Sequence, residues 1–295
     1  MQFGIALPNF DRLGTRDAVV EIARQAEALG YDSLWTTDHV MMAKGQEEPY
    51  GHILEALTTL TYVAALTERV RLGVSVIVLP MREPILFAKQ VATLDLLSGG
   101  RVMMGFGAGW NEREFRYLGA EFGNRGKRLD EYLRVLRHLW TSPEPHYEGE
   151  FVQFSDALFS PRSPQPNGPP IVIGGPSAAA MRRAATLADG WQPSGLAPEK
   201  FTAGAQRVRE LANGRKVEIQ LRLHTRVGQH LPDIHSAAGA VQTTLSGSVD
   251  EVVARLEQYR AAGLTHLISN FGDETPEAYI EHMRRFAQEV RPKLS

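Results

Sequence analysis

Two patterns of hydrophobic positions alternate along this chain. Short runs of consecutive apolar, often β-branched residues are separated by longer segments in which apolar residues recur every three or four positions. Such runs are typical of strands buried on both faces of a parallel sheet, and the longer segments are typical of amphipathic helices. The predicted strands cover residues 3–7, 33–37, 70–79, 101–106, 171–173, 189–193, 217–227 and 266–269.

A helical segment follows each predicted strand. Gly30 and Gly263 end two of these helices, and Pro84 opens another. Ser248 and Glu251 have the spacing of a capping box at a helix start. The predicted helices cover residues 17–29, 53–66, 84–97, 110–119, 125–140, the alanine-rich segment after Ser177, 198–211, 248–262 and 275–290.

The order of these elements predicts the fold. Eight strand–helix units in 295 residues indicate an α/β protein, and they match the length of a (β/α)₈ TIM barrel with loop insertions. A doubly wound sheet is the alternative. No break in composition divides the chain, and the proline-rich segment 141–170 is flanked by units of one kind. We therefore expect a single barrel domain over residues 1–295.

Composition removes several classes of function. The net charge of −2 offers no global attraction for nucleic acid or an anionic membrane. The absence of cysteine excludes disulfides, thiolate metal sites and a cysteine nucleophile, and the histidines lack metal-ligand spacing, so no metal is expected. No apolar run is long enough to span a membrane, and no leader pattern is evident at the start. A cytoplasmic location is the expectation.

Two glycine-rich turns stand where the chemistry of a barrel is expected, at the carboxyl ends of strands. Gly107-Ala108-Gly109-Trp110 follows the fourth strand, and Gly174-Gly175-Pro176-Ser177 follows the fifth. Turns of this kind can present free backbone N–H groups and a helix start to an anion such as a phosphate. Similar turns also occur without any ligand, so both interpretations stay open at this point.

One histidine is placed for proton transfer. His39 ends the second strand beside Asp38, where its imidazole can donate a hydrogen bond or exchange a proton near neutral pH, or can be a purely structural side chain. No lysine falls at the end of a predicted strand, and no Gly-x-Ser-x-Gly motif is present. This pattern favours an enzyme whose chemistry is supplied by a bound organic cofactor.

Seven segments in this order resemble the luciferase-like monooxygenase superfamily, in particular the branch that uses the deazaflavin coenzyme F420. They are GIALPN, GYDSLWTTDH, RLGVSVIVLPMREP, GGRVMMGFGAGWNEREF, RGKRLDEYLRVLRHLW, PIVIGGPSAAAMRRAATLADGW and SGSVDEVVARLEQYRAAGLTHLI. The resemblance implies a flavin or deazaflavin ring over the strand ends, with its phosphate tail at residues 107–110 and 174–177. It also implies His39 near the ring as hydrogen-bond partner or proton donor, a non-proline cis peptide at Ser75-Val76 behind the ring, and a homodimer.

The choice of cofactor turns on the residues after the second strand. Flavin-using relatives tend to carry Glu-His-His there and deazaflavin users Asp-His, so Asp38-His39 favours F420, with FMN as the alternative. The implied reaction is hydride transfer between F420 and a small organic substrate with an activated C=C, C=N, C=O or nitro group. The sugar-phosphate dehydrogenases of this branch carry an acid where Trp110 stands, which argues against a sugar phosphate.

Two other functions remain open from the sequence, an FMN-dependent monooxygenase and a non-catalytic barrel that binds a flavin. The substrate pocket is expected to be lined by Asn9 and by the loops 41–52, 141–170 and 228–247, because long irregular loops of this kind are often functional.

Overall fold

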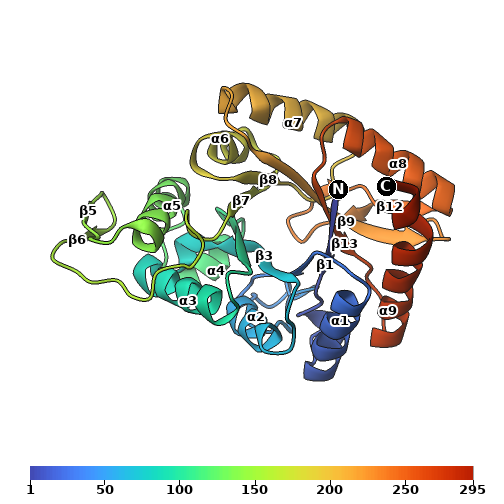
Figure 1. The fold of residues 1–295 in the computed structure, drawn as a ribbon, viewed down its shortest axis with the longest axis horizontal. Coiled ribbons are helices and arrows are strands. Elements are labelled where there is room, and N and C mark those ends of the chain that lie inside the picture. Colours follow the sequence, from blue (N-terminus) through green and yellow to red (C-terminus); the bar gives the residue numbers. More distant parts are fainter. Residues whose placement is uncertain (295) are drawn as a thin grey trace.

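A closed barrel of parallel strands forms the centre of the protein (Figure 1). The computed structural model describes residues 1–294. Within them, eight strands pair in the order β1-β2-β3-β4-β7-β8-β9-β13, and β13 returns to β1. The strands are β1 (Gln2–Ala6), β2 (Ser33–Thr36), β3 (Arg71–Val78), β4 (Val102–Gly107), β7 (Ile171–Gly174), β8 (Gly190–Gln192), β9 (Glu218–Val227) and β13 (His266–Asn270). The predicted (β/α)₈ barrel is confirmed.

Helices surround this barrel and cover the outer face of its strands (Figure 1). One boundary differs from the expectation, because the helix predicted from residue 53 begins at Ala56: Ile53 pairs with Phe10 in a short bridge, and Glu55 caps the helix. The helices are α1 (Arg16–Ala28), α2 (Ala56–Ala64), α3 (Pro84–Leu97), α4 (Glu112–Tyr117), α5 (Arg125–Thr141), α6 (Ala178–Leu187), α7 (Pro198–Ala212), α8 (Val249–Ala261) and α9 (Pro276–Arg285).

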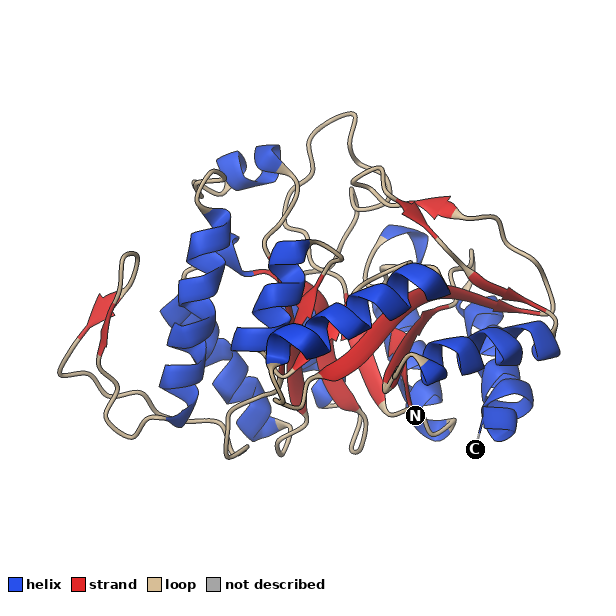
Figure 2. Ribbon diagram, turned by 90° about the horizontal axis from the view of Figure 1, so that it is seen from above, coloured by secondary structure: helices blue, strands red, loops and turns tan. Residues whose placement is uncertain are grey.

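Two insertions carry small strands outside the barrel. Segment 141–170 forms a hairpin of β5 (Tyr147–Glu148) and β6 (Gln153–Phe154), which projects away from the body of the barrel (Figure 2). Segment 228–247, expected to be irregular, contains the hairpin of β10 (Ile234–His235) and β11 (Val241–Gln242), followed by β12 (Leu245–Gly247) beside β9.

A tryptophan fills the middle of the barrel. Trp35 is fully buried and packs in the interior with four apolar side chains, Ala6, Met103, Val172 and Ile268. A Cβ atom added at Gly73 would lie 2.5 Å from the Trp35 ring, so glycine is required there to admit the indole. Because this layer closes the interior, open space is left at the carboxyl ends of the strands.

Candidate active site

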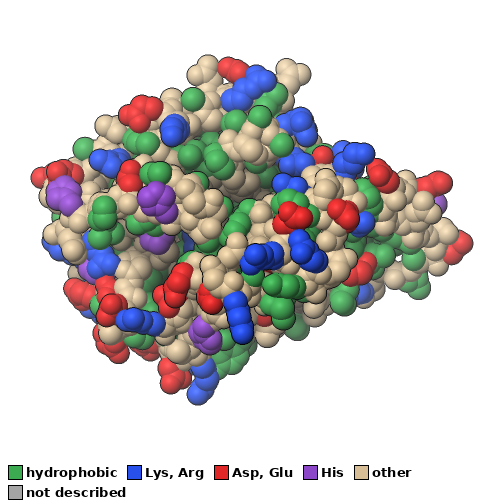
Figure 3. All heavy atoms as spheres, turned by 180° about the vertical axis from the view of Figure 1, so that it is seen from behind, with side chains coloured by type: hydrophobic (Ala, Val, Ile, Leu, Met, Phe, Trp, Pro, Cys, Tyr) green, Lys and Arg blue, Asp and Glu red, His purple; other side chains and the backbone are tan. Residues whose placement is uncertain are grey.

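A cavity of about 750 Å³ opens at the carboxyl ends of the barrel strands. Figure 3 views the molecule from this side and shows the face hollowed near its centre, with apolar side chains around the hollow and charges of both signs beyond it. Every barrel strand or the loop after it contributes to the lining. Representative residues in strand order are Pro8, His39, Ser75, Gly107, Gly174, Ser194, Arg222 and Asn270.

Most residues singled out in the sequence come together in this cavity. Ser177 is not among the lining residues; its hydroxyl oxygen instead accepts a hydrogen bond from the Ala180 N–H at 3.1 Å and so caps α6. The sequence-predicted residues that line the cavity are Asp38, His39, Ser75, Val76, Gly107, Ala108, Gly109, Trp110, Gly174, Gly175 and Pro176.

Two expectations about the lining are wrong. Asn9 is fully buried, because its side-chain amide donates hydrogen bonds to the carbonyl oxygens of Thr37 and Leu54 and joins the loop after β1 to its neighbours. Segment 141–170 contributes no lining residue, because its hairpin projects away from the barrel. Loop 41–52, through Tyr50, and segment 228–247 do line the cavity.

The Ser75–Val76 peptide is cis, as the resemblance implied. Beyond this bond, the side chain of Val76 lies over the glycines of the next two strands. A Cβ atom at Gly107 would come within 2.8 Å of Val76, and one at Gly174 within 2.7 Å. Packing against Val76 therefore requires glycine at both positions, independently of any ligand.

The two glycine-rich turns lie side by side, because β4 and β7 are paired neighbours. The backbone N–H groups of Ala108, Gly109, Trp110, Gly175 and Ser177 donate no hydrogen bond to any described residue. The turn after β7 leads directly into α6, whose N-terminus adds positive potential. A backbone arrangement of this kind, with free donors from two adjacent turns, suits a phosphate-sized anion.

A cation stands beside the first of these turns. The Arg125 side chain donates from Nε to the carbonyl oxygen of Gly109 at 3.2 Å, and its guanidinium stacks on Phe122. This positive charge adds to the attraction that the turns have for an anion.

His39 is held on three sides. Its ring stacks on Tyr50 at 4.5 Å and meets Trp110 edge to face at 5.9 Å. Its Nδ1 lies 2.8 Å from a carboxylate oxygen of Glu114, which reaches it from α4. The other carboxylate oxygen of Glu114 accepts the backbone N–H of Val40 at 2.6 Å, so one buried acid fixes both the ring and the loop that carries it.

Glu114 settles which ring nitrogen of His39 carries the proton. Burial would raise the pKa of the Glu114 carboxyl, but hydrogen bonds from His39 and from the Val40 backbone hold that pKa below its usual value. An ionised carboxylate only accepts hydrogen bonds, so His39 Nδ1 must be the donor. Nε2 is then the nitrogen that exchanges a proton, and it makes no hydrogen bond to any described residue.

Asp38 has a different task from its neighbour. Its buried carboxylate pairs with Arg82 at 2.6 Å and accepts the backbone N–H of Val78 at 2.9 Å. These bonds tie the loop after β2 to the end of β3. Asp38 therefore positions the segment that carries His39, and both of its oxygens are already engaged.

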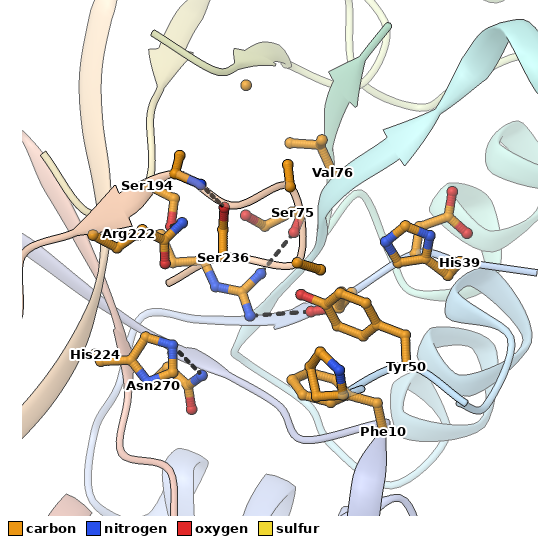
Figure 4. A pocket seen from close by; sticks show the side chains of 18 of the residues that line it. Phe10, His39, Tyr50, Ser75, Val76, Ser194, Arg222, His224, Ser236 and Asn270 are labelled. Atoms are coloured by element: carbon orange, nitrogen blue, oxygen red, sulfur yellow. Dashed lines mark hydrogen bonds between the residues drawn. The ribbon is translucent and has the colours of Figure 1, made fainter. Parts of the chain in front are cut away.

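Polar side chains of β9 and β13 lie across the cavity from His39 (Figure 4). Arg222 donates to the Ser75 carbonyl oxygen at 2.7 Å and to the Thr37 hydroxyl at 3.0 Å. His224 lies 3.4 Å from the Asn270 amide nitrogen, and burial together with the nearby Arg222 charge lowers its pKa to about 4. His224 is therefore neutral near pH 7.

Three of these residues were missed from the sequence. Glu114 lies 75 positions from His39, and nothing local marks it as the partner of that ring. Tyr50 sits in a loop without a motif. Arg222 did leave a signal, because polar residues alternate with Ile219, Leu221 and Leu223 along β9 and must face the barrel interior.

Among residues 1–294, no helix has the length and apolarity needed to cross a membrane.

Comparison with known proteins points to one family. Residues 1–238 match the family model described as luciferase-like monooxygenase. An F420-dependent glucose-6-phosphate dehydrogenase of Amycolatopsis mediterranei is 30% identical over 96% of both chains. An FMNH(2)-dependent dimethylsulfone monooxygenase of Pseudomonas putida is 28% identical over 87% of this chain and 68% of its own. The crystal structure of monooxygenase RslO1 from Streptomyces bottropensis superposes with a TM-score of 0.83 at 22% identity, covering all of both chains.

Proposed function

The chain belongs to the luciferase-like monooxygenase family, and from this premise we propose that it transfers a hydride between coenzyme F420 and a small organic substrate. The proposal rests on the hydrogen bonding of His39: Nδ1 is bound to Glu114, whereas Nε2 has no partner among the described residues and is available to a ligand in the cavity. The F420-dependent relative at 30% identity and the Asp38-His39 pair favour the deazaflavin over FMN.

Three features of the cavity fit such a cofactor. The free N–H groups of residues 108–110 and 175, with Arg125 beside them, would hold its phosphate. Val76 forms an apolar wall against which a ring can rest. The buried Oε1 of Gln192, a lining residue, has no hydrogen-bond donor, because its amide nitrogen is directed to Gln220. The imide N–H of a flavin or deazaflavin ring is the kind of donor that this oxygen lacks.

The bound deazaflavin supplies a ring carbon that accepts or releases a hydride. The protein then has to move one proton to or from the substrate. With Nδ1–H held by Glu114, neutral His39 accepts a proton at Nε2 when a substrate hydroxyl is oxidised, and protonated His39 returns it when a carbonyl is reduced. The Glu114 carboxylate stabilises the positive charge that His39 carries after the first of these steps.

A second function is supported by a separate observation. The FMNH(2)-dependent monooxygenase relative uses another cofactor on a chain that is 28% identical to this one. In that case the same cavity would bind reduced FMN and consume oxygen. A barrel that binds a flavin without turnover is the third alternative.

Visible absorption spectra of the protein titrated with F420 and with FMN test the proposal. We expect tight binding of F420, and His39→Ala should retain this binding but lose about 10²-fold or more in turnover of a substrate found by screening. His230→Ala is the matched control, because His230 is exposed and lies outside the cavity. Tight binding of FMN with oxygen consumption, and no affinity for F420, would refute the proposal in favour of the monooxygenase.

A further inference from the structure

Arg222 is a half-buried cation that lines the cavity, and its charge has no partner. Its guanidinium makes two hydrogen bonds, both to neutral oxygens, those of Ser75 and Thr37. It forms no ion pair with any described carboxylate. Burial lowers the pKa of Arg222, and the groups that oppose this effect are the hydroxyls of Tyr50 and Tyr279.

Two other arginines near the cavity are neutralised, whereas Arg125, beside the glycine-rich turn after β4, has no ion pair with any described residue. Arg82 pairs with Asp38 at 2.6 Å, and Arg226 pairs with Asp273 at 2.8 Å. These two lining carboxylates are therefore already engaged. Because a buried charge is costly unless it is paired, the unmatched positive charge of Arg222 favours the entry of an anion.

A comparison with Arg101 shows that the guanidinium of Arg222 also lacks the hydrogen bonds that stabilise an arginine without an ion pair. Arg101 is also partly buried without an ion pair, at the opposite end of the barrel beside the start of β4. Its guanidinium, however, makes five hydrogen bonds to backbone and hydroxyl oxygens. A guanidinium has five N–H groups, so Arg101 is saturated, whereas Arg222 keeps donors that can still bind a ligand.

The position of Arg222 suits a substrate rather than the cofactor phosphate. Arg222 lies on β9, whereas the glycine-rich turns that suit a phosphate follow β4 and β7. Arg222 and His39 approach the cavity from opposite sides (Figure 4). A ligand bound to Arg222 through an anionic group would extend toward the imidazole that exchanges the proton.

We propose that Arg222 binds an anionic group of the substrate, a carboxylate or a similar planar oxyanion. This inference rests on the proposed function and names its substrate class: the hydride is exchanged with an organic acid. The planar guanidinium matches the geometry of a carboxylate, which a point charge such as lysine does not.

Binding of benzoate and of its neutral analogue benzamide to the purified protein, measured by calorimetry, tests this proposal without any turnover. We expect the wild type to bind benzoate at least about tenfold more tightly than benzamide. Arg222→Gln should abolish this preference, and Arg222→Lys should keep part of it. The matched control is Arg215→Gln, which removes the same charge from a side chain that also donates to two oxygens, at the opposite end of the barrel.

The outcomes separate the sources of the anion. Equal binding of benzoate and benzamide by the wild type overturns the proposal whether or not the variant folds. An unchanged preference in Arg222→Gln also overturns it, because the anion then binds elsewhere, for example at the glycine-rich turns. Reduced F420 carries a charge on its own ring and could be the anion that binds Arg222. If Arg222→Gln loses affinity for reduced F420 but binds benzoate as the wild type does, Arg222 is assigned to the cofactor and the proposal is overturned. A benzoate preference that depends on Arg222 in a protein without affinity for F420 supports the anion site and refutes the proposed function instead.

Discussion

Replacing Glu114 by glutamine isolates the effect of its charge on His39. The substitution keeps the size of the side chain but leaves a single oxygen where two are used. That oxygen cannot accept both the Val40 N–H and the His39 Nδ1–H, which are bound to different carboxylate oxygens. If it stays with Val40, the new NH₂ group faces His39, and Nδ1 must become an acceptor. The proton then moves to Nε2.

The size of the effect follows from the geometry. Two unit charges separated by the 2.8 Å between Nδ1 and the carboxylate oxygen attract by ~6 kcal/mol at an effective dielectric constant of 20, which is an upper bound. The net contribution of a hydrogen bond to a charged group is ~1.5–3 kcal/mol, because both groups also lose water. Since 1.36 kcal/mol corresponds to a tenfold change in rate, we expect turnover to fall by about 10- to 150-fold.

Two measurements check this prediction. The ¹⁵N chemical shifts of His39 report the tautomer directly, and we expect Nδ1–H in the wild type and Nε2–H in Glu114→Gln. Glu131→Gln is the control, because Glu131 is also a buried carboxylate that accepts backbone N–H groups, but it lies on α5 away from the cavity. Identical His39 shifts in the wild type and in Glu114→Gln would refute the reasoning, whatever the turnover.

Three further changes have defined consequences. Gly174→Ala places a methyl group within 2.7 Å of Val76 and should cost ~1–3 kcal/mol of stability in urea unfolding, together with a loss of cofactor affinity. Asp38→Asn leaves Arg82 without its buried partner and should cost ~3 kcal/mol in the same assay. Burial and a nearby guanidinium lower the pKa of His224 to about 4, against about 6.5 in the unfolded chain, so between these values the unfolded state binds more protons. Stability should therefore fall by up to ~3 kcal/mol as the pH drops from 6.5 to 4, and His224→Gln should lack this part of the loss.

Two of these changes have a matched control. Gly123→Ala should be nearly neutral, because the nearest contact of its added Cβ is the flexible end of Glu121. Glu83→Gln is the control for Asp38→Asn, since Glu83 is an exposed helix cap without an ion pair to any described residue. An Asp38→Asn protein as stable as the wild type would show that Glu55, whose carboxylate lies 3.7 Å from Arg82, compensates for the lost partner. A His224→Gln protein with an unchanged pH profile would place the acid-sensitive group elsewhere.

The barrel could be predicted because each part of its pattern is local. Strands such as Ile171–Gly174 are buried on both faces and read as continuous apolar runs, and a glycine or proline marks most junctions. Boundaries shifted where a tertiary contact overrode the local pattern. Ile53 is not part of the helix predicted to begin there, because it pairs with Phe10, 43 positions earlier in the chain. The periodicity of the residues near Ile53 contains no information about this pairing.

The rule that barrel sites lie at the carboxyl ends of strands located the cavity, but it selects positions and not partners. His39 was found because it ends a strand, whereas Glu114 was not, because its link to His39 exists only after the α4 segment folds over the loop that follows β2. Glu114 itself does not line the cavity and contacts it only through His39.

For Arg222 the sequence did contain a pattern, the alternation of polar and apolar residues along β9, but this pattern did not show that the arginine lacks an acidic partner. Polar residues at alternate positions of β9 face the interior, and an interior arginine would ordinarily be matched by an acid on another strand. The position of such an acid depends on the register of the strands around the closed barrel. The sequence alone therefore could not show that no described carboxylate pairs with Arg222. The missing counter-charge becomes visible once all eight strand ends face one cavity, and it is the observation on which the proposed anion site at Arg222 rests.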